Sequence, residues 1–526
     1  MKKRNFNFAE LFRLDLEAEA SSPAVAPTNM VAMSAALKSH HLMPKLGNET
    51  QGGGSEAVKF ALAWRRSDII EWVLFWAFIA GLAWVPFLYG SNQLIAWGIN
   101  AVLFPSLAAI YEVSLLVRGD SHPVGIKGLK VPAALFVGVV LWIVIQNVTW
   151  TPSSWHHPIW AMAADALGKP VVGSISVNRD LTTLALVRMI TSASGFWLAV
   201  QLCRNASRVN LFMIAIAVII AGYSAYGLVS FALVPGTIQR IGDTWSHGYV
   251  TSTFIDRDHF ANYAGIGLVV MCGLIMRLYR HAVVTTDGSL QLRIASIIDV
   301  TGQRGAFLLA GAFLILVAML FTGSRGGFIA SGFGLLALGV LGFGARNMGF
   351  VGNRTIFILG TCLFAVVCFV FGNMIFGQFS ERGIADQTRM AVDMVMLRSI
   401  FDAPLLGYGY GTFIDVFPMF RDQSVGVQGQ WEFAHNTYLE VFQGLGLVFG
   451  AMLVACVVLL ILKCFKGAVT RLESMTPRVA VSVAILVGVQ ALVDFSLEMQ
   501  AVTLTFMALL GAGIAQSESS RLALND

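Results

Sequence analysis

Long apolar windows recur along the chain from residue 69 onward. Each is about 20 residues long, which is the length an α-helix needs to cross the hydrocarbon core of a bilayer. The pattern predicts about twelve spans, at residues 69–89, 93–116, 131–150, 182–203, 210–234, 261–279, 305–322, 326–344, 354–376, 435–463, 477–493 and 499–516. We therefore expect an all-α fold, a polytopic transmembrane helix bundle.

The polar segments divide the chain into three parts. Residues 1–60 are Ala/Ser/Pro-rich and end near a Gly-Gly-Gly-Ser run, which predicts a flexible cytosolic tail. Residues 61–516 form the predicted transmembrane domain, and residues 517–526 a cytosolic C-terminal tail. Because the first 60 residues are polar, we expect no cleavable signal peptide.

Composition supports a membrane protein. Hydrophobic residues make up 56% of the chain and charged residues 12%, against roughly 25% charged in a soluble domain. The six cysteines fall in apolar runs or at their cytosolic ends, which predicts neither disulfides nor a thiolate metal site. The net charge of +5 is modest, and we expect no nucleic-acid partner.

The basic residues orient the bundle. With a cytosolic N-terminus, 25 of the 35 Lys and Arg residues fall in inside segments and 10 at the outer face, as the positive-inside rule requires. Both termini are then cytosolic, and the long loops 151–181, 235–260 and 377–434 are periplasmic. In the last loop, apolar residues recur four, seven and eleven positions after the first one. This spacing predicts an amphipathic helix near 385–401 that lies along the membrane surface.

Two arginines stand out at the outer face. Arg188 lies inside an apolar window, where a charge usually faces a bundle interior or polar cavity; the alternative is that it snorkels to the headgroups. Arg325, in Ser324-Arg-Gly-Gly327, begins a helix after an outer hairpin, and a cation beside a helix N-terminus can bind an anion. The alternative there is a plain tight turn.

The stretch from Thr253 to Tyr263 precedes a span on the outer side. Asp258 is the expected helix cap, so that Arg257 and His259 flank the start of the helix. A lone histidine at such a place is often structural.

A second polar stretch opens the helix after the largest loop. Asn436, Glu440 and Gln443 form a polar stripe on one face of an apolar span. Glu440 needs a partner within the membrane, and we expect that partner to be an arginine. His435 at the mouth of the helix is a candidate general base. The alternative is a structural Glu–Arg pair. The sequence contains no nucleotide-binding phosphate loop, metal-ligand spacing or nucleophile elbow.

Together these stretches resemble the O-antigen ligase/polymerase superfamily of integral membrane glycosyltransferases, which includes O-antigen polymerases, O-antigen ligases and exopolysaccharide polymerases. The resemblance covers roughly residues 140–516. It rests on motifs in a fixed order: Trp155-His-His-Pro-Ile-Trp160, Thr253–His259, Thr322-Gly-Ser-Arg-Gly-Gly327, Arg389 followed by Pro404-Leu-Leu-Gly-Tyr-Gly-Tyr-Gly411, His435–Glu440, and Val493-Asp-Phe495.

The resemblance implies a bacterial inner-membrane enzyme that uses undecaprenyl-pyrophosphate-linked glycans and transfers them at the periplasmic face, with inversion and without a metal or other cofactor. Arg257, Arg325 and Arg389 match arginines that contact the pyrophosphate, and His435 matches the family's essential histidine. We also assign Arg188, His259, Asn436 and Tyr438 to substrate binding, and Glu440 to catalysis beside His435. One departure is that Asp256 and Asp258 replace asparagines of the commoner pattern, which weakens the pull of Arg257 on phosphate.

The leading hypothesis is an O-antigen or exopolysaccharide polymerase, with a flippase and a chain-length co-polymerase as partners. The nearest alternative is a ligase that moves finished glycan to lipid A core, for lipopolysaccharide, or to protein. A third is a solute transporter of the bicarbonate-carrier type, although transporters usually show inverted repeats and broken helices near the midplane. Polymerase and ligase share one donor chemistry, so the sequence leaves them open, along with the sugar, linkage and acceptor.

Overall fold

The structure, a computed structural model, describes residues 53–233, 248–284, 301–343, 387–425 and 431–518. Residues 1–73 and 74–526 form two compact units. Of the first, the structure describes residues 53–73, which are the first part of helix α3.

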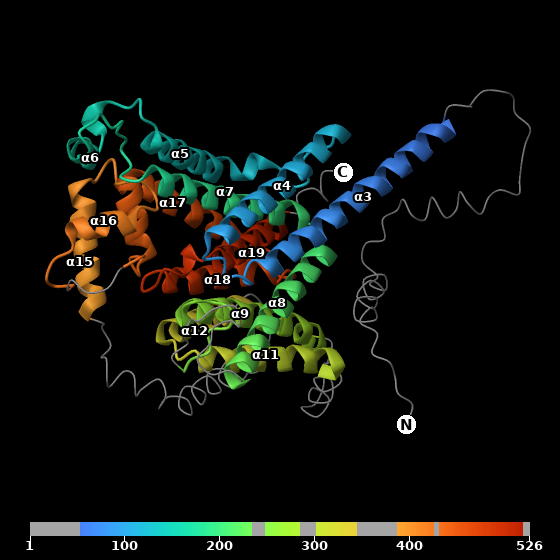
Figure 1. The fold of residues 1–526 in the computed structure, drawn as a ribbon. Coiled ribbons are helices and arrows are strands. Elements are labelled where there is room, and N and C mark those ends of the chain that lie inside the picture. The colour runs from blue at the N-terminus through green and yellow to red at the C-terminus, as the bar shows by residue number, and fades with distance from the viewer. Residues whose placement is uncertain (1–52, 234–247, 285–300, 344–386, 426–430, 519–526) are drawn as a thin grey trace, which may run out of the picture. The chain divides into compact units, whose positions relative to one another are not determined.

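Every regular element of the described residues is helical (Figure 1). The α-helices are α3 (Gly53–Trp84), α4 (Leu94–Arg118), α5 (Lys130–Asn147), α6 (Ile159–Leu167), α7 (Arg179–Leu202), α8 (Ala206–Leu233), α9 (Arg257–Val284), α11 (Ala306–Phe321), α12 (Arg325–Phe343), α15 (Gln387–Asp402), α16 (Phe413–Phe420), α17 (Thr437–Thr470), α18 (Thr476–Gln490) and α19 (Gln500–Glu518).

The predicted polytopic helical bundle is confirmed. Nine helices of the described residues are long and apolar enough to cross a membrane, and the shorter apolar helices Ile69–Trp84 and Thr476–Gln490 coincide with two further predicted spans. The predicted span 354–376 lies outside the described residues, as do residues 1–52 of the N-terminal tail. The large loop is partly helical as expected, because α15 occupies the position of the predicted amphipathic helix.

Two helices are buried along most of their length. α19 packs against α7, α17 and α18, while α9 packs against α8, α11, α12 and α18. Small residues allow this close packing: a side chain at Gly511 of α19 would meet the carbonyl of Phe196, and one at Gly267 of α9 would meet Ile220. Small residues at helix contacts are typical of membrane bundles.

Helix α17 is broken near its start. Gly446 has φ 76° and ψ 170°, a conformation open to glycine, and a Cβ there would lie 2.5 Å from the carbonyl oxygen of Leu405. The loop after α15 covers the break: the amides of Tyr408 and Gly409 donate to the carbonyls of Gln443 and Gly444. The Gly-Tyr-Gly-Tyr-Gly motif thus pairs backbone groups that the interrupted helix leaves open.

Several distant segments meet at one end of the bundle, which we call the site end. α9, α12 and α17 begin there and α18 ends there. The amide of Thr437 donates to the carbonyl of Ala491, which joins the start of α17 to the end of α18. A side chain at Gly327 would contact Ala261, so the start of α12 lies against the start of α9.

Candidate functional site

His435 lies just before the first turn of α17. The helix begins at Thr437, two residues later than the sequence predicts, and the side-chain oxygen of Asn436 accepts from the amide of Leu439 at 3.3 Å as its N-cap. His435 itself has φ 54°, an uncommon value for a residue with a side chain. The amide of Ala434 donates to the buried Glu440 carboxylate at 3.3 Å. The hydrogen bonds of Ala434 and Asn436 fix the backbone on both sides of His435. His435 therefore keeps this strained conformation, as functional residues often do.

A buried carboxylate lies between two histidines. Oδ1 of Asp494 is 4.0 Å from Nδ1 of His435 and 3.7 Å from Nε2 of His259. The Phe495 ring contacts both imidazoles edge to face, with centroids 4.6 and 4.5 Å away. Gln490 and Ser496 donate to the second oxygen of Asp494. His259 and His435, 176 positions apart in the sequence, therefore share one anion and one aromatic wall.

The sequence alone indicates no role for Asp494. The residue appeared only within Val493-Asp-Phe495 as part of the family resemblance. The available signal was a carboxylate directly after an apolar span. Such a residue is expensive to place within the membrane and therefore a candidate functional residue.

The surroundings of His435 favour its neutral form. Burial lowers the pKa of the imidazole below the usual value of 6.5, and the nearby Arg389 lowers it further, while Asp494 raises it in opposition. A neutral imidazole with one ring nitrogen free of its proton can accept a proton.

Arg389 reaches the same place from α15. Its guanidinium donates to the carbonyl of Val493 at 2.9 Å and lies 3.9 Å from the carboxylate of Asp258. The side chain is 39% exposed, so it borders the protein surface at the site. One turn further along α15, Asp393 hydrogen-bonds to the side chain of Asn436, and burial raises the pKa of this carboxyl. Asp393 was also missed from the sequence, where it lies within the predicted amphipathic helix near 385–401.

The start of α9 differs in one detail from the prediction. Asp256, not Asp258, caps the helix, because its carboxylate accepts from the amide of Asp258 at 2.7 Å. Asp258 instead hydrogen-bonds to the Ser324 side chain, on the loop before α12. The prediction failed because the helix begins at Arg257, so the capping position falls one residue before it. The Arg257 guanidinium lies over the Tyr249 ring, 4.0 Å from its centroid.

Arg325 is the first residue of α12. The hydroxyl of Ser324 accepts from the amide of Gly327 at 3.0 Å and caps this helix. A Cβ at Gly326 would lie 3.2 Å from the Gln490 side chain, which itself bonds to Asp494. The start of α12 is therefore packed beside the histidine cluster.

Arg188 has partners of its own. Its guanidinium pairs with Glu498 at 2.9 Å, donates to the carbonyl of the same residue, and lies 4.6 Å from the centroid of the Trp97 ring. Glu440 interacts electrostatically with Arg188 and Glu498, but the hydrogen bond it accepts comes from the Ala434 amide. The structure thus places Arg188 in a partly buried ion pair with Glu498 rather than among the residues around His435.

Tyr438 packs the helices together. Its hydroxyl donates to the carbonyl of Gly488 on α18 at 3.1 Å.

Among the residues that the structure describes, no group of three or more His, Cys, Asp or Glu side chains is placed to hold a metal ion. The positive groups of the candidate site are arginines, which stay charged and bind phosphate bidentately.

Comparison with known families gives a match over part of the chain. Residues 310–455 match a family model described as O-antigen ligase, which confirms the resemblance to the O-antigen ligase/polymerase superfamily. The match includes Arg325, Arg389 and His435 and ends before Asp494. No curated protein matches the chain. The chain is a multi-pass helical membrane protein, and its family match indicates a function of the O-antigen ligase or polymerase type.

Proposed function

We propose that the protein is a polysaccharide polymerase that transfers undecaprenyl-pyrophosphate-linked glycan to a hydroxyl group of an acceptor sugar. The observation that carries the proposal is the meeting of His435, Asp494 and Arg389, which come from the start of α17, the end of α18 and α15. A neutral imidazole, a fixed carboxylate and a partly exposed guanidinium at one place suit a general-base-assisted attack that displaces a phosphate leaving group.

In the proposed reaction, His435 removes the proton of the acceptor hydroxyl as its oxygen attacks the anomeric carbon. The new C–O bond forms on the face opposite the pyrophosphate, and the bond between the anomeric carbon and the pyrophosphate oxygen breaks, so the configuration inverts. The departing lipid pyrophosphate carries the electron pair. Arg257, Arg325 and Arg389 stabilise its negative charge in place of a metal ion, and no cofactor is required.

Asp494 supports His435 in this scheme. Its negative charge stabilises the imidazolium that forms when the histidine takes the proton, as a carboxylate does in other acid–base sites. Glu440 acts indirectly, by holding the Ala434 amide next to His435. His259, Asn436, Tyr438 and Arg188 remain proposed substrate contacts.

A ligase reaction is the second candidate, and the description of the matched family favours it. The two activities share the donor and differ in the acceptor: a lipid-linked glycan for the polymerase, and lipid A core or protein for the ligase. Purified protein incubated with lipid-linked repeat units alone tests the choice. A ladder of products supports the polymerase, whereas transfer only after a lipid A core or protein acceptor is added supports the ligase. No transfer in either case contradicts both.

We further propose an inner-membrane location with both termini cytosolic and the site end periplasmic, as the distribution of Lys and Arg favours. Lipid-linked substrate then arrives by a flippase, and a chain-length co-polymerase acts beside the enzyme. Reporter fusions after residues 170 and 415 should be periplasmic, and one after residue 470 cytosolic. A cytosolic signal at 415 contradicts the mechanism, because the site would lie on the wrong side.

A further inference from the structure

One face of α15 carries a stripe of exposed apolar side chains. Met390, Met394, Leu397 and Phe401 recur at the spacing of a single helix face and are 58%, 55%, 36% and 69% exposed. The other side of α15 is already buried in the protein, where Val392, Val395 and Met396 pack against α16 and its neighbours. The helix is therefore apolar on two sides, and only one has a protein partner among the described residues.

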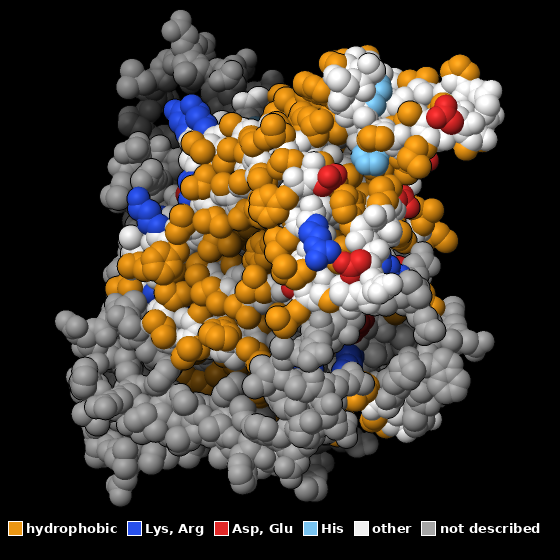
Figure 2. All heavy atoms as spheres, turned by 90° about the vertical axis from the view of Figure 1, so that its left-hand side faces the viewer, with side chains coloured by type: hydrophobic (Ala, Val, Ile, Leu, Met, Phe, Trp, Pro, Cys, Tyr) orange, Lys and Arg blue, Asp and Glu red, His pale blue; other side chains and the backbone are white. Residues whose placement is uncertain are grey.

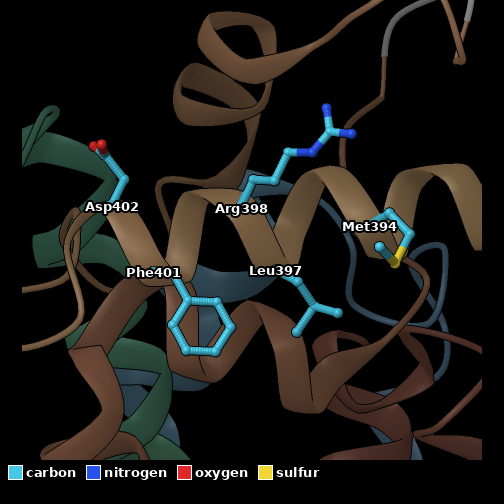
Figure 3. A pocket seen from close by; sticks show the side chains of 5 residues that line it. All are labelled: Met394, Leu397, Arg398, Phe401 and Asp402. Carbon is cyan, nitrogen blue, oxygen red and sulfur yellow. The ribbon is translucent and has the colours of Figure 1, made fainter.

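The stripe has a sharp polar edge. In Figure 3, the Leu397 and Phe401 side chains leave α15 on one side, whereas Arg398 and Asp402 leave it on the other. Arg398 forms an ion pair with Asp422 at 2.7 Å and remains 64% exposed. On the surface of α15 lies an open groove of about 530 Å³, lined by Met394, Leu397, Arg398, Phe401 and Asp402. An apolar face beside exposed charges is typical of a helix at a membrane surface.

The stripe continues onto a membrane-spanning helix. After α15, Leu405 is 65% exposed, and its backbone packs against Gly446 of α17. The amide of Leu447 donates to the carbonyl of Pro404 at 2.7 Å. Leu447 and Val448, which are 39% and 51% exposed, belong to a predicted span. Exposed apolar residues on a span face lipid, so the α15 stripe joins a surface that already lies against acyl chains.

The orientation of α15 agrees with a position at the membrane surface. The helix runs crosswise to α5 and α7 at the site end (Figure 1), as expected for a helix parallel to the membrane plane. On the face of the molecule shown in Figure 2, hydrophobic side chains cover a broad area with few charged groups. Exposed apolar patches of this kind mark interaction surfaces.

We propose that the α15 stripe docks into the membrane leaflet on the site side, with lipid acyl chains as its partner. Met394, Leu397 and Phe401 then lie among the chains, and Arg398 extends to the headgroups, as long basic side chains do at membrane surfaces. Because Arg389 directly precedes Met390, this docking also fixes the depth of the Arg389 guanidinium at the membrane surface. The inference does not depend on which reaction the protein catalyses.

Site-specific fluorescence tests the proposal without altering the native cysteines. A small genetically encoded fluorescent amino acid replaces Met394, Phe401, Arg398 or Val448, one at a time, in the full chain reconstituted in phosphatidylcholine nanodiscs. Val448 is the control for a lipid-facing position and Arg398 the control for the polar side of the same helix. Quenching is measured with nitroxide-labelled lipid and, separately, with aqueous iodide. All four positions are exposed, and size-exclusion chromatography confirms that each variant is folded.

We expect the probes at 394 and 401 to behave as the probe at 448 does. Quenching by the lipid nitroxide should be several-fold stronger than at 398, and quenching by iodide several-fold weaker. Strong iodide quenching at 394 and 401 overturns the proposal, because the stripe then faces water and fits a soluble partner or a glycan. Weak quenching by both reagents also overturns it, because another protein segment then covers the stripe.

Discussion

Oδ1 of Asp494 lies 4.0 Å from Nδ1 of His435, at the junction between the end of α18 and the start of α17. This distance is too long for a direct hydrogen bond, but it is short enough for strong attraction once the imidazole has taken up a proton. Both residues are held by backbone contacts between the two helices, since the Thr437 hydroxyl donates to the carbonyl of Asp494 at 3.2 Å. Catalytic hydrogen bonds are often longer in the free enzyme and shorten when substrate binds.

The first prediction is that Asp494→Asn reduces glycan transfer by about a hundredfold or more while donor binding persists. The substitution keeps the shape of the side chain but removes the charge that stabilises a protonated His435, and positioned acid–base groups contribute about a hundredfold to ten-thousandfold. Turnover with saturating lipid-linked donor measures the effect. Ser496→Ala is the matched control, because it removes a hydrogen bond to Asp494 and keeps the charge; we expect about a tenfold loss or less.

The second prediction concerns pH. Because burial and Arg389 lower the pKa of His435 below 6.5, the imidazole is neutral at pH 7 and the transfer rate should be on its plateau there. Acidification should reduce the rate through a single protonation step whose midpoint lies below 6.5. Asp494 raises the pKa of His435, so Asp494→Asn should move this midpoint to still lower pH. His435→Ala should abolish the step, and a step retained in that variant removes His435 as the base.

Much of the fold could be predicted from the chain because lipid imposes a simple rule on sequence. A helix that crosses a bilayer must be long and apolar, so the spans around α4, α5, α7 and α17 were visible as windows. The break at Gly446 was not visible. A glycine inside a helix of this length is common, and only the carbonyl of Leu405, brought there by tertiary packing, shows why the backbone departs from the helix.

The site could be predicted only where one short stretch contained the signal. Arg325 begins helix α12 and His435 lies two residues before helix α17, and the structure brings both to the site end. Asp494 follows α18 as a single carboxylate, and nothing near it in the sequence indicates that it faces His435. For Arg188, the sequence indicates that a charge within an apolar window is costly, but it does not indicate the partner. That partner, the partly buried Glu498, comes from far along the chain.

The third prediction separates a phosphate contact from a structural turn at Arg325. Arg325→Ala should abolish transfer with little change in detergent melting temperature, because Ser324 still caps α12. Arg325→Lys should restore only part of the activity, since a point charge cannot reproduce bidentate phosphate contact. Full activity with lysine indicates a general cation. Loss of folding in the alanine variant indicates a structural turn.

The fourth prediction is that transfer persists in the presence of strong chelators such as EDTA. In the proposed mechanism the arginines carry the positive charge that stabilises the departing pyrophosphate. The assay compares initial rates of purified protein with and without chelator, using lipid-linked donor freed of divalent ions. Loss of activity on chelation and recovery on addition of magnesium or manganese would show that the arginine account is wrong.

The last prediction concerns the partly buried pair of Arg188 and Glu498, whose side chains are 15% and 17% exposed and lie 2.9 Å apart. If the pair is structural, Arg188→Met leaves the partly buried Glu498 without its cation, which lowers stability because the remaining charge is uncompensated. The double variant Arg188→Met/Glu498→Gln removes both charges and should recover much of that loss, giving a large coupling in a double-mutant cycle. Detergent melting and turnover are measured for both single variants and the double variant. Recovery of stability together with turnover assigns Arg188 to support of the fold beneath Glu440. Recovery of stability without turnover instead assigns the guanidinium to substrate, as the sequence predicts.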